Sequence, residues 1–211
     1  IPLLKKINKK KKLNIFLSTG MSSWNEINDA LKALSNHKII LMQCTSLYPC
    51  PENLVGLNVI NEMKRKFGKK YDYGFSDHTE GAEAAISSIC FGANYVEKHI
   101  TFSKKMYGSD AKFSMEPNEF KSFCNSLKRV KKMISNPVNK NNVKPVSKMK
   151  MIFEKNIIAG RNIIKGQKIK LEDLEYKKSK SGIKAYNYKK ILGKKLKKNI
   201  KKGEILKKFF F

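Results

Sequence analysis

Two of the chain's three histidines stand at the ends of short apolar runs, each near an acidic residue. His78 follows Asp77 in the segment GFSDHTEG, and His99 follows Glu97 in YVEKHI. Imidazole nitrogens bind divalent metals, and nearby carboxylates act as further ligands or orient the imidazoles. If the two runs are neighbouring parallel strands, about 4.8 Å apart, both imidazoles can reach one ion, although alternation sends one neighbour of each histidine to the other face of the sheet. The pattern predicts a metal or catalytic site; the alternative is two strand-end histidines with ordinary hydrogen-bond partners.

Hydroxyl and carboxyl groups stand at equivalent places along the chain. Ser18 ends the run NIFLS, Ser46 and Tyr48 follow KIILMQC, and Ser76 lies two residues before the first of the two histidines. Several hydroxyls and backbone N–H groups together suit a phosphate or a carboxylate. Strand capping explains any single serine equally well, and Tyr48 either lines a pocket or packs. Asp110, in YGSDAKF, either orients a substrate hydroxyl or forms a turn.

Four short apolar runs alternate with helical stretches through the first 135 residues. Apolar spacing, caps and closing glycines predict helices at residues 24–34, from Pro51 or Glu52 to Gly68, at 81–90, and from Pro117 to Ile134, the last residue of a buried stripe. Repeated strand–helix units imply parallel strands with right-handed crossovers, hence an α/β fold. In such folds the chemistry gathers at the C-terminal ends of the strands, where the polar residues above lie. His37, in a helix-to-strand loop at the opposite end, is predicted to be structural.

The remainder of the chain has a different pattern. Residues 136–150 contain two prolines and no apolar stripe, which predicts a linker. Residues 151–211 contain short apolar pairs separated by turns, with one helix expected at residues 185–192. This pattern predicts a small domain of short strands.

The composition is strongly basic, with a formal net charge of +28. Such a charge can indicate nucleic acid, an anionic membrane surface or an anionic substrate. All but three of the 45 basic residues are lysines, whereas base edges are read mainly by arginine. The lysine excess is better explained by the codon usage of an AT-rich genome, and we predict no nucleic-acid partner. The runs at residues 9–12 and 194–198 are expected to be solvated.

Other compositional features indicate a folded cytoplasmic protein. A hydrophobic content of 41% supports a folded core. No apolar run approaches the roughly 18 residues of a membrane span, and no signal peptide is visible. The four cysteines form no CxxC pair, which argues against structural zinc and predicts buried free thiols in a reducing compartment; they are Cys44, Cys50, Cys90 and Cys124.

Several segments together resemble the sialic acid synthase family, which includes the N-acetylneuraminate, legionaminate and pseudaminate synthases. They are LSTGM, QCTSLYPCP, GFSDHTEG, GANYVEKHITF and GSDAKFSMEPNEF. The last part of the chain, with IIKGQKIKLEDL and SGIKAYNYKKILGKKLKKNIKKGEIL, resembles that family's C-terminal antifreeze-like (SAF) domain. The resemblance implies a (β/α)8 TIM barrel of which residues 1–135 are about the last four βα units. A linker at 136–150 and a SAF domain at 151–211 would follow.

The resemblance also implies an activity. The family condenses phosphoenolpyruvate with an N-acetylhexosamine, such as N-acetylmannosamine or a related diacetamido sugar. The products are a nine-carbon 2-keto-3-deoxy acid and phosphate. By match to the family's motifs, His78 and His99 would hold Mn²⁺ or Mg²⁺, which acts as a Lewis acid.

Further roles follow from the same match. The residues expected to bind phosphoenolpyruvate are Ser18, Ser46 and Ser76. Tyr48 and Asp110 would face the sugar, and Glu97 would belong to the catalytic residues together with Asp110.

This chain departs from the family pattern in two ways. Only four barrel units are recognised, so the chain resembles a fragment that we expect to be inactive alone. The family's SAF domain also carries an arginine that reaches the partner subunit's site in a homodimer and binds the sugar's N-acetyl group. The segment KKSKSGI places Lys178 at that position, and lysine lacks the planar fork of arginine. The alternatives are a noncatalytic carbohydrate-binding remnant and, less favoured, a basic nucleic-acid-binding protein.

Overall fold

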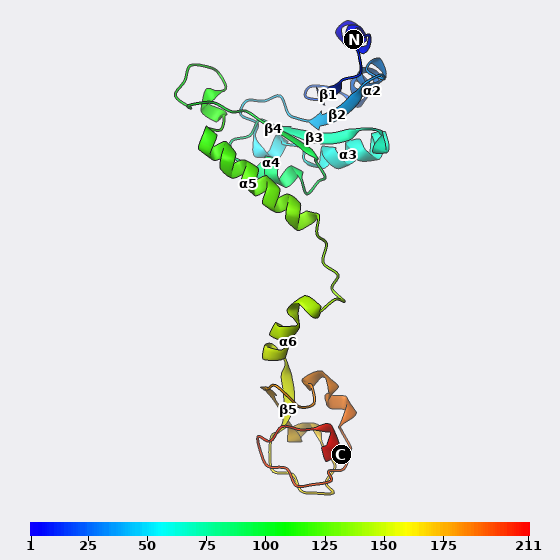
Figure 1. Ribbon diagram of the computed structural model, residues 1–211, viewed down its shortest axis with the longest axis vertical. Helices are drawn as coiled ribbons and strands as arrows, with labels where there is room; N and C mark the ends of the chain where they lie inside the picture. Colours follow the sequence, from blue (N-terminus) through cyan, green and yellow to red (C-terminus); the bar gives the residue numbers. More distant parts are fainter. The chain divides into compact units, whose positions relative to one another are not determined.

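The computed structural model describes residues 1–211, which divide into two units, Ile1–Pro137 and Val138–Phe211. The first unit contains a four-stranded parallel sheet and the second a two-stranded antiparallel sheet (Figure 1). The predicted fold class, a partial α/β barrel followed by a small β-rich domain, is confirmed. Along the chain, the boundary between the two units falls between Pro137 and Val138, inside the predicted linker at residues 136–150.

The sheet of the first unit follows the order of the sequence. Its strands are β1 (Asn14–Ser18), β2 (Lys38–Gln43), β3 (Asp72–Asp77) and β4 (Tyr95–Lys98). All neighbouring strands are parallel, and Ser76 lies opposite Glu97 and Asp77 opposite Lys98. The C-terminal ends of β3 and β4 are therefore level, as the sequence predicted.

Helices follow each strand and cover one face of the sheet. They are α2 (Trp24–Ala33), α3 (Asn58–Phe67), α4 (Glu83–Ser88) and α5 (Pro117–Ile134), and Figure 1 shows α3, α4 and α5 on the same side of the strands. Leu41 and Phe75 point from the strands into the core that α2 and α3 complete with Leu31 and Ile60. The opposite face of the strands carries the side chains considered below.

The structure corrects three of the predicted helices. The second begins at Asn58 rather than near residue 51, after a 3-10 turn at Glu52–Leu54. The cause is Gly56, whose φ of 67° is left-handed and interrupts a helix. The helix predicted at residues 185–192 is a 3-10 helix, Ala185–Lys190. Ile134, predicted to belong to the buried stripe of α5, is 44% exposed, and Phe123 is the one fully buried residue of that helix.

An additional short helix, α1 (Pro2–Asn8), precedes the sheet and was not predicted. No helix of the chain is both long and apolar enough to cross a membrane. All four cysteines are free; Cys44 and Cys50 are buried and Cys124 is half-buried. Cys90 is exposed, so the prediction of buried thiols is wrong there, because this residue lies in the turn that follows α4.

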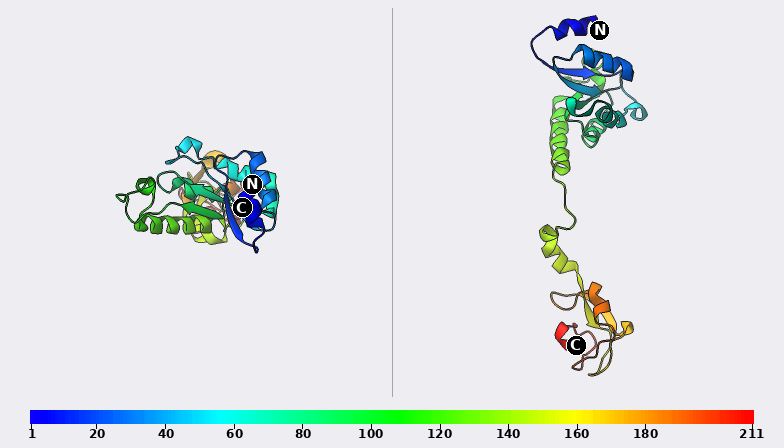
Figure 2. Two further views of the ribbon diagram at one scale, coloured as in Figure 1. Left: turned by 90° about the horizontal axis from the view of Figure 1, so that it is seen from above. Right: turned by 90° about the vertical axis from the view of Figure 1, so that its right-hand side faces the viewer.

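The second unit consists of short elements around its own apolar core. It contains α6 (Ser147–Phe153), β5 (Lys155–Ala159), β6 (Leu174–Lys178) and 3-10 turns at Lys144–Val146, Leu171–Asp173, Ala185–Lys190 and Lys208–Phe210. Ile157, Ile163 and Leu206 are almost fully buried. Leu206 donates its N–H to the carbonyl of Ile157, so the last residues run beside β5 (Figure 2). α6 begins inside the predicted linker and was not predicted; it has no buried residue.

Candidate active site

The structure brings the two predicted histidines together. His78 directly follows β3 and His99 directly follows β4, and their ring centroids are 5.3 Å apart. The level ends of the two parallel strands place both rings at one height on the same face of the sheet. Two imidazoles at this separation have the chemistry of a pair of ligands for one divalent ion.

The ring of His78 is held in one orientation by its surroundings. Its Nδ1 lies 2.8 Å from the carbonyl oxygen of Thr45, so the ring donates Nδ1–H to that carbonyl. In the neutral ring with this hydrogen bond the lone pair is on Nε2, the arrangement of a metal-binding imidazole with an oriented partner. The backbone of His78 is fixed as well, because Cys50 donates its N–H to the His78 carbonyl at 2.8 Å. Sequence reasoning missed Thr45, since a backbone carbonyl leaves no signature in residue type.

His99, like His78, is partly buried. Its side chain is 35% exposed, and its Nδ1 lies 3.8 Å from Oδ2 of Asp110, which is longer than a hydrogen bond. Met115 donates its N–H to the carbonyl of His99 at 2.9 Å. That contact returns the chain after β4 to the sheet and brings Asp110 beside the imidazole. The oxygen Oδ1 of Asp110 accepts a hydrogen bond from Ser109 Oγ.

Ser76 and Glu97 form a direct pair beside the histidines. Ser76 Oγ donates to Glu97 Oε1 at 2.6 Å and lies 3.5 Å from Nε2 of His78. Ser76 is only 3% exposed. The alternation of the strands explains this grouping, since residues 76, 78, 97 and 99 share one face.

Tyr48 lies against both imidazoles. Its ring centroid is 4.2 Å from that of His78 and 5.8 Å from that of His99. Desolvation raises the pKa of the Tyr48 phenol, with smaller contributions from Cys44, Asp110 and Glu97. The phenol therefore remains a neutral O–H donor at neutral pH.

Ser18 and Ser46 lie at the same edge, at the ends of the first two strands. A Cβ on Gly20 would clash with Ser46 Oγ and come 2.8 Å from Cys44 Sγ, so a larger residue would displace these two side chains. Gly20 donates its N–H to Cys44 Sγ at 3.1 Å. Burial raises the pKa of the Cys44 thiol, which argues against a nucleophilic thiolate here.

Three other candidates are placed elsewhere. Asp77 points to the opposite face, where its carboxylate pairs with Lys98 at 2.9 Å, so it is not available beside the imidazoles. Lys178 lies in the second unit at the end of β6, with Nζ 4.7 Å from the ring centroid of Phe153. His37 has both ring nitrogens near backbone groups, Nδ1 accepting from the N–H of Leu13 and Nε2 3.1 Å from the Ile7 carbonyl. This is the structural role predicted for it.

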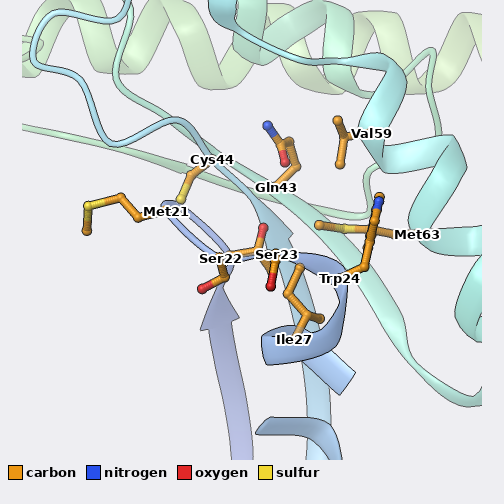
Figure 3. Close-up of a pocket in the computed structure, with 10 residues that line it drawn as sticks. Met21, Ser22, Ser23, Trp24, Ile27, Gln43, Cys44, Val59 and Met63 are labelled. Atoms are coloured by element: carbon orange, nitrogen blue, oxygen red, sulfur yellow. The ribbon is translucent and has the colours of Figure 1, made fainter. Parts of the chain in front are cut away.

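A cavity of about 320 Å³ lies beside the start of α2 and the C-terminal end of β2. Met21, Trp24, Gln43, Cys44 and Met63 contribute to its lining (Figure 3). None of the predicted site residues lines it. No group of three or more His, Cys, Asp or Glu side chains converges as a metal cage.

Comparison with protein families gives matches over most of the chain. Residues 1–139 match the NeuB family and residues 155–208 match the SAF domain. The chain is 37% identical to N,N'-diacetyllegionaminic acid synthase of Campylobacter jejuni over 98% of this chain and 62% of that protein. It is 31% identical to human N-acetylneuraminate-9-phosphate synthase over 64% of this chain and 38% of that protein.

The fold agrees with a solved structure of the same kind. The N-acetylneuraminic acid (sialic acid) synthetase of Leptospira borgpetersenii, in complex with citrate, superimposes with a TM-score of 0.63 and 27% identity. The match covers 71% of this chain and 53% of that one. The chain spans about 62% of the length of the Campylobacter relative. The matched family, the matched SAF domain and the fold agree, and this chain belongs to the NeuB family.

Proposed function

We propose that this chain carries the metal-binding and phosphoenolpyruvate-binding part of a sialic-acid-type synthase. The enzyme would be a transferase that joins phosphoenolpyruvate to an N-acetylated amino sugar, giving a nine-carbon 2-keto-3-deoxy acid and phosphate. The observation that carries the proposal is the pair of imidazoles beside the Ser76–Glu97 hydrogen bond, at the ends of β3 and β4. The names of the relatives, which are synthases of legionaminic acid and of N-acetylneuraminate 9-phosphate, support this substrate class.

A divalent ion, Mn²⁺ or Mg²⁺, fits the donors on this face. His78 offers Nε2, because its Nδ1–H is engaged by the Thr45 carbonyl. His99 offers a second imidazole nitrogen beside it. A set of two protein ligands leaves positions for water and substrate oxygens, as a catalytic ion requires. The ion would supply Lewis-acid polarisation of the sugar's aldehyde.

The hydroxyl groups at the strand ends suit an anionic substrate. Ser18 and Ser46 would donate to the phosphate or carboxylate of phosphoenolpyruvate. The Ser76 hydroxyl, now donated to Glu97 at 2.6 Å, would turn to the same ligand. Glu97 would then accept a proton from the water that adds to C2 of the substrate. C3 would first form the new bond to the aldehyde carbon, whose oxygen takes up a proton; water would then add to the cationic C2, and loss of phosphate from C2 would leave the ketone.

Two further residues would contact the sugar. Tyr48 presents a neutral phenol over the imidazoles and would donate to a sugar hydroxyl. Asp110 would accept from another hydroxyl, because its carboxylate lies at the accessible side of His99. These contacts would orient the aldehyde for attack.

The second unit would contribute to sugar recognition in a homodimer. Lys178 stands where the family has a sugar-binding arginine, and its single ammonium cannot bond an acetyl oxygen bidentately. We therefore propose a different or broader sugar preference. The four free cysteines support a cytoplasmic location.

A chimera tests this function directly. Residues 1–211 would replace the matching segment of the Campylobacter jejuni synthase, and phosphate release from phosphoenolpyruvate would be measured with a diacetamido hexose and Mn²⁺. We expect turnover that falls at least about 100-fold in His78→Ala and His99→Ala. His37→Gln, at the third histidine, should retain it. A chimera that folds without turnover, or full turnover in His78→Ala, would contradict the proposal.

A further inference from the structure

We infer that the buried ion pair between Asp77 and Lys98 is a positioning device for the two imidazoles. This inference rests on the proposed function and deepens it. Lys98 Nζ lies 2.9 Å from Asp77 Oδ2, and the two side chains are 1% and 0% exposed. Each residue directly precedes one of the two histidines. The pair therefore links β3 to β4 immediately before the site, on the opposite face of the sheet.

The pair belongs to a closed set of hydrogen bonds around His78. Asp77 Oδ1 accepts from the N–H of Thr79 at 2.9 Å and from its hydroxyl at 2.8 Å. Lys98 Nζ also donates to the carbonyl of Thr79. Asp77 and Thr79, the two residues that flank His78, therefore both accept hydrogen bonds from the Lys98 ammonium on β4. This fixes the direction in which the imidazole leaves the backbone, toward the Thr45 carbonyl and toward His99.

Stability alone gives little reason to bury these charges. Desolvation of a buried ion pair offsets much of its Coulomb attraction, and apolar replacement is often neutral. A second Lys–Asp ion pair joins neighbouring strands, with Lys38 Nζ 3.0 Å from Asp72 Oδ2. Its side chains are 53% and 34% exposed, respectively. That pair stands at the N-terminal ends of β2 and β3, away from the site. The buried pair differs in location and in having oriented partners, which is what a positioning role requires.

The first test reads the imidazoles themselves. The double variant Asp77→Asn/Lys98→Met removes both charges, and Lys38→Met/Asp72→Asn is the matched control. Ring ¹⁵N spectra of the metal-free chain would be recorded at pH 8. We expect His78 to be an Nδ1–H tautomer in the wild type and the control, and a mixture of tautomers in the first variant. Unchanged ring signals in that variant, with only a lower unfolding temperature, would overturn the inference.

The second test measures Mn²⁺ binding to the same proteins. Loss of the buried pair should weaken Mn²⁺ affinity about 10- to 100-fold, as is usual when the groups behind a ligand are removed. The control should bind as the wild type does, and equal affinity in all three would overturn the inference. If the wild type binds no Mn²⁺, metal binding as part of the proposed function is refuted. The ring spectra still test whether the ion pair positions the imidazoles. If the double variant does not fold, the same ring signals are recorded for Asp77→Glu. That substitution lengthens the side chain by one methylene group.

Discussion

His78 and His37 are the same residue type in two different settings. His37 has both ring nitrogens beside backbone groups, whereas His78 uses only Nδ1 in this way. The sequence distinguished them by position, because His78 ends a strand and His37 follows a helix. The family resemblance implied that Ser76, Glu97 and the two imidazoles belong to one site, and strand alternation with level strand ends explains why they lie together. The sequence could not identify the Thr45 carbonyl, because backbone contacts across a loop depend on the folded path of the chain.

The cysteines give a prediction at the scale of single residues. Burial raises the pKa of the Cys44 and Cys50 thiols, so their thiolates form only at higher pH. Cys90 is exposed. At pH 8 a maleimide or disulfide reagent should therefore label Cys90 well before Cys44 and Cys50, and labelling of the buried pair should accelerate as pH rises. Peptide mass spectrometry over time gives the order, and labelling of Cys44 as fast as Cys90 would contradict it.

At the scale of elements, local signals determined which helices were predicted correctly. α2 begins where its cap predicts: Ser23 and Glu26 form a capping box. α3 was predicted to begin too early, because Pro51 and Glu52 are residue types typical of a helix start, whereas the helix begins only after Gly56. The left-handed conformation of that glycine depends on the turn around it and has no periodic signal.

The cap of α2 gives a prediction for that element. Ser23→Ala removes the side-chain acceptor for the Glu26 N–H and should lower the free energy of unfolding by about 1 kcal/mol. Ser22→Ala is the matched control, since Ser22 is the exposed neighbour outside the helix. Urea denaturation of both variants measures the difference. Equal losses of stability in the two would show that the cap is not the cause.

At the scale of the whole molecule, the apolar clusters of the first unit are separate from the apolar core of the second. The second unit also buries a carboxylate completely, that of Asp173. Asp173 accepts hydrogen bonds from the Arg161 guanidinium and from the Lys170 N–H. All three residues belong to the second unit, so this charged cluster stabilises that unit by itself.

The separate cores predict that a change in one unit acts locally. Asp173→Asn should lower the stability of the second unit by about 1–3 kcal/mol, because it weakens charge-assisted hydrogen bonds to a buried group. Hydrogen exchange should then accelerate within residues 155–208 and stay unchanged in the strands of the first unit. Equal acceleration in both units would contradict two independent cores.

The net charge of +28 is also a property of the whole chain. It allows salt-dependent association with any polyanion, so affinity for DNA alone would not identify a function. Binding at a specific site is lost when one of its residues is substituted. Binding driven by the net charge is not lost on any single substitution. The central claim is therefore best tested at the histidines.

The most direct measurement is a Mn²⁺ titration of the full chain, following the electron paramagnetic resonance signal of free Mn²⁺. We predict one bound ion in the wild type, with binding lost in His78→Ala and in His99→Ala. His37→Gln should bind as the wild type does, because His37 has no part in the pair. Equal Mn²⁺ binding by the wild type and His78→Ala would contradict the central claim.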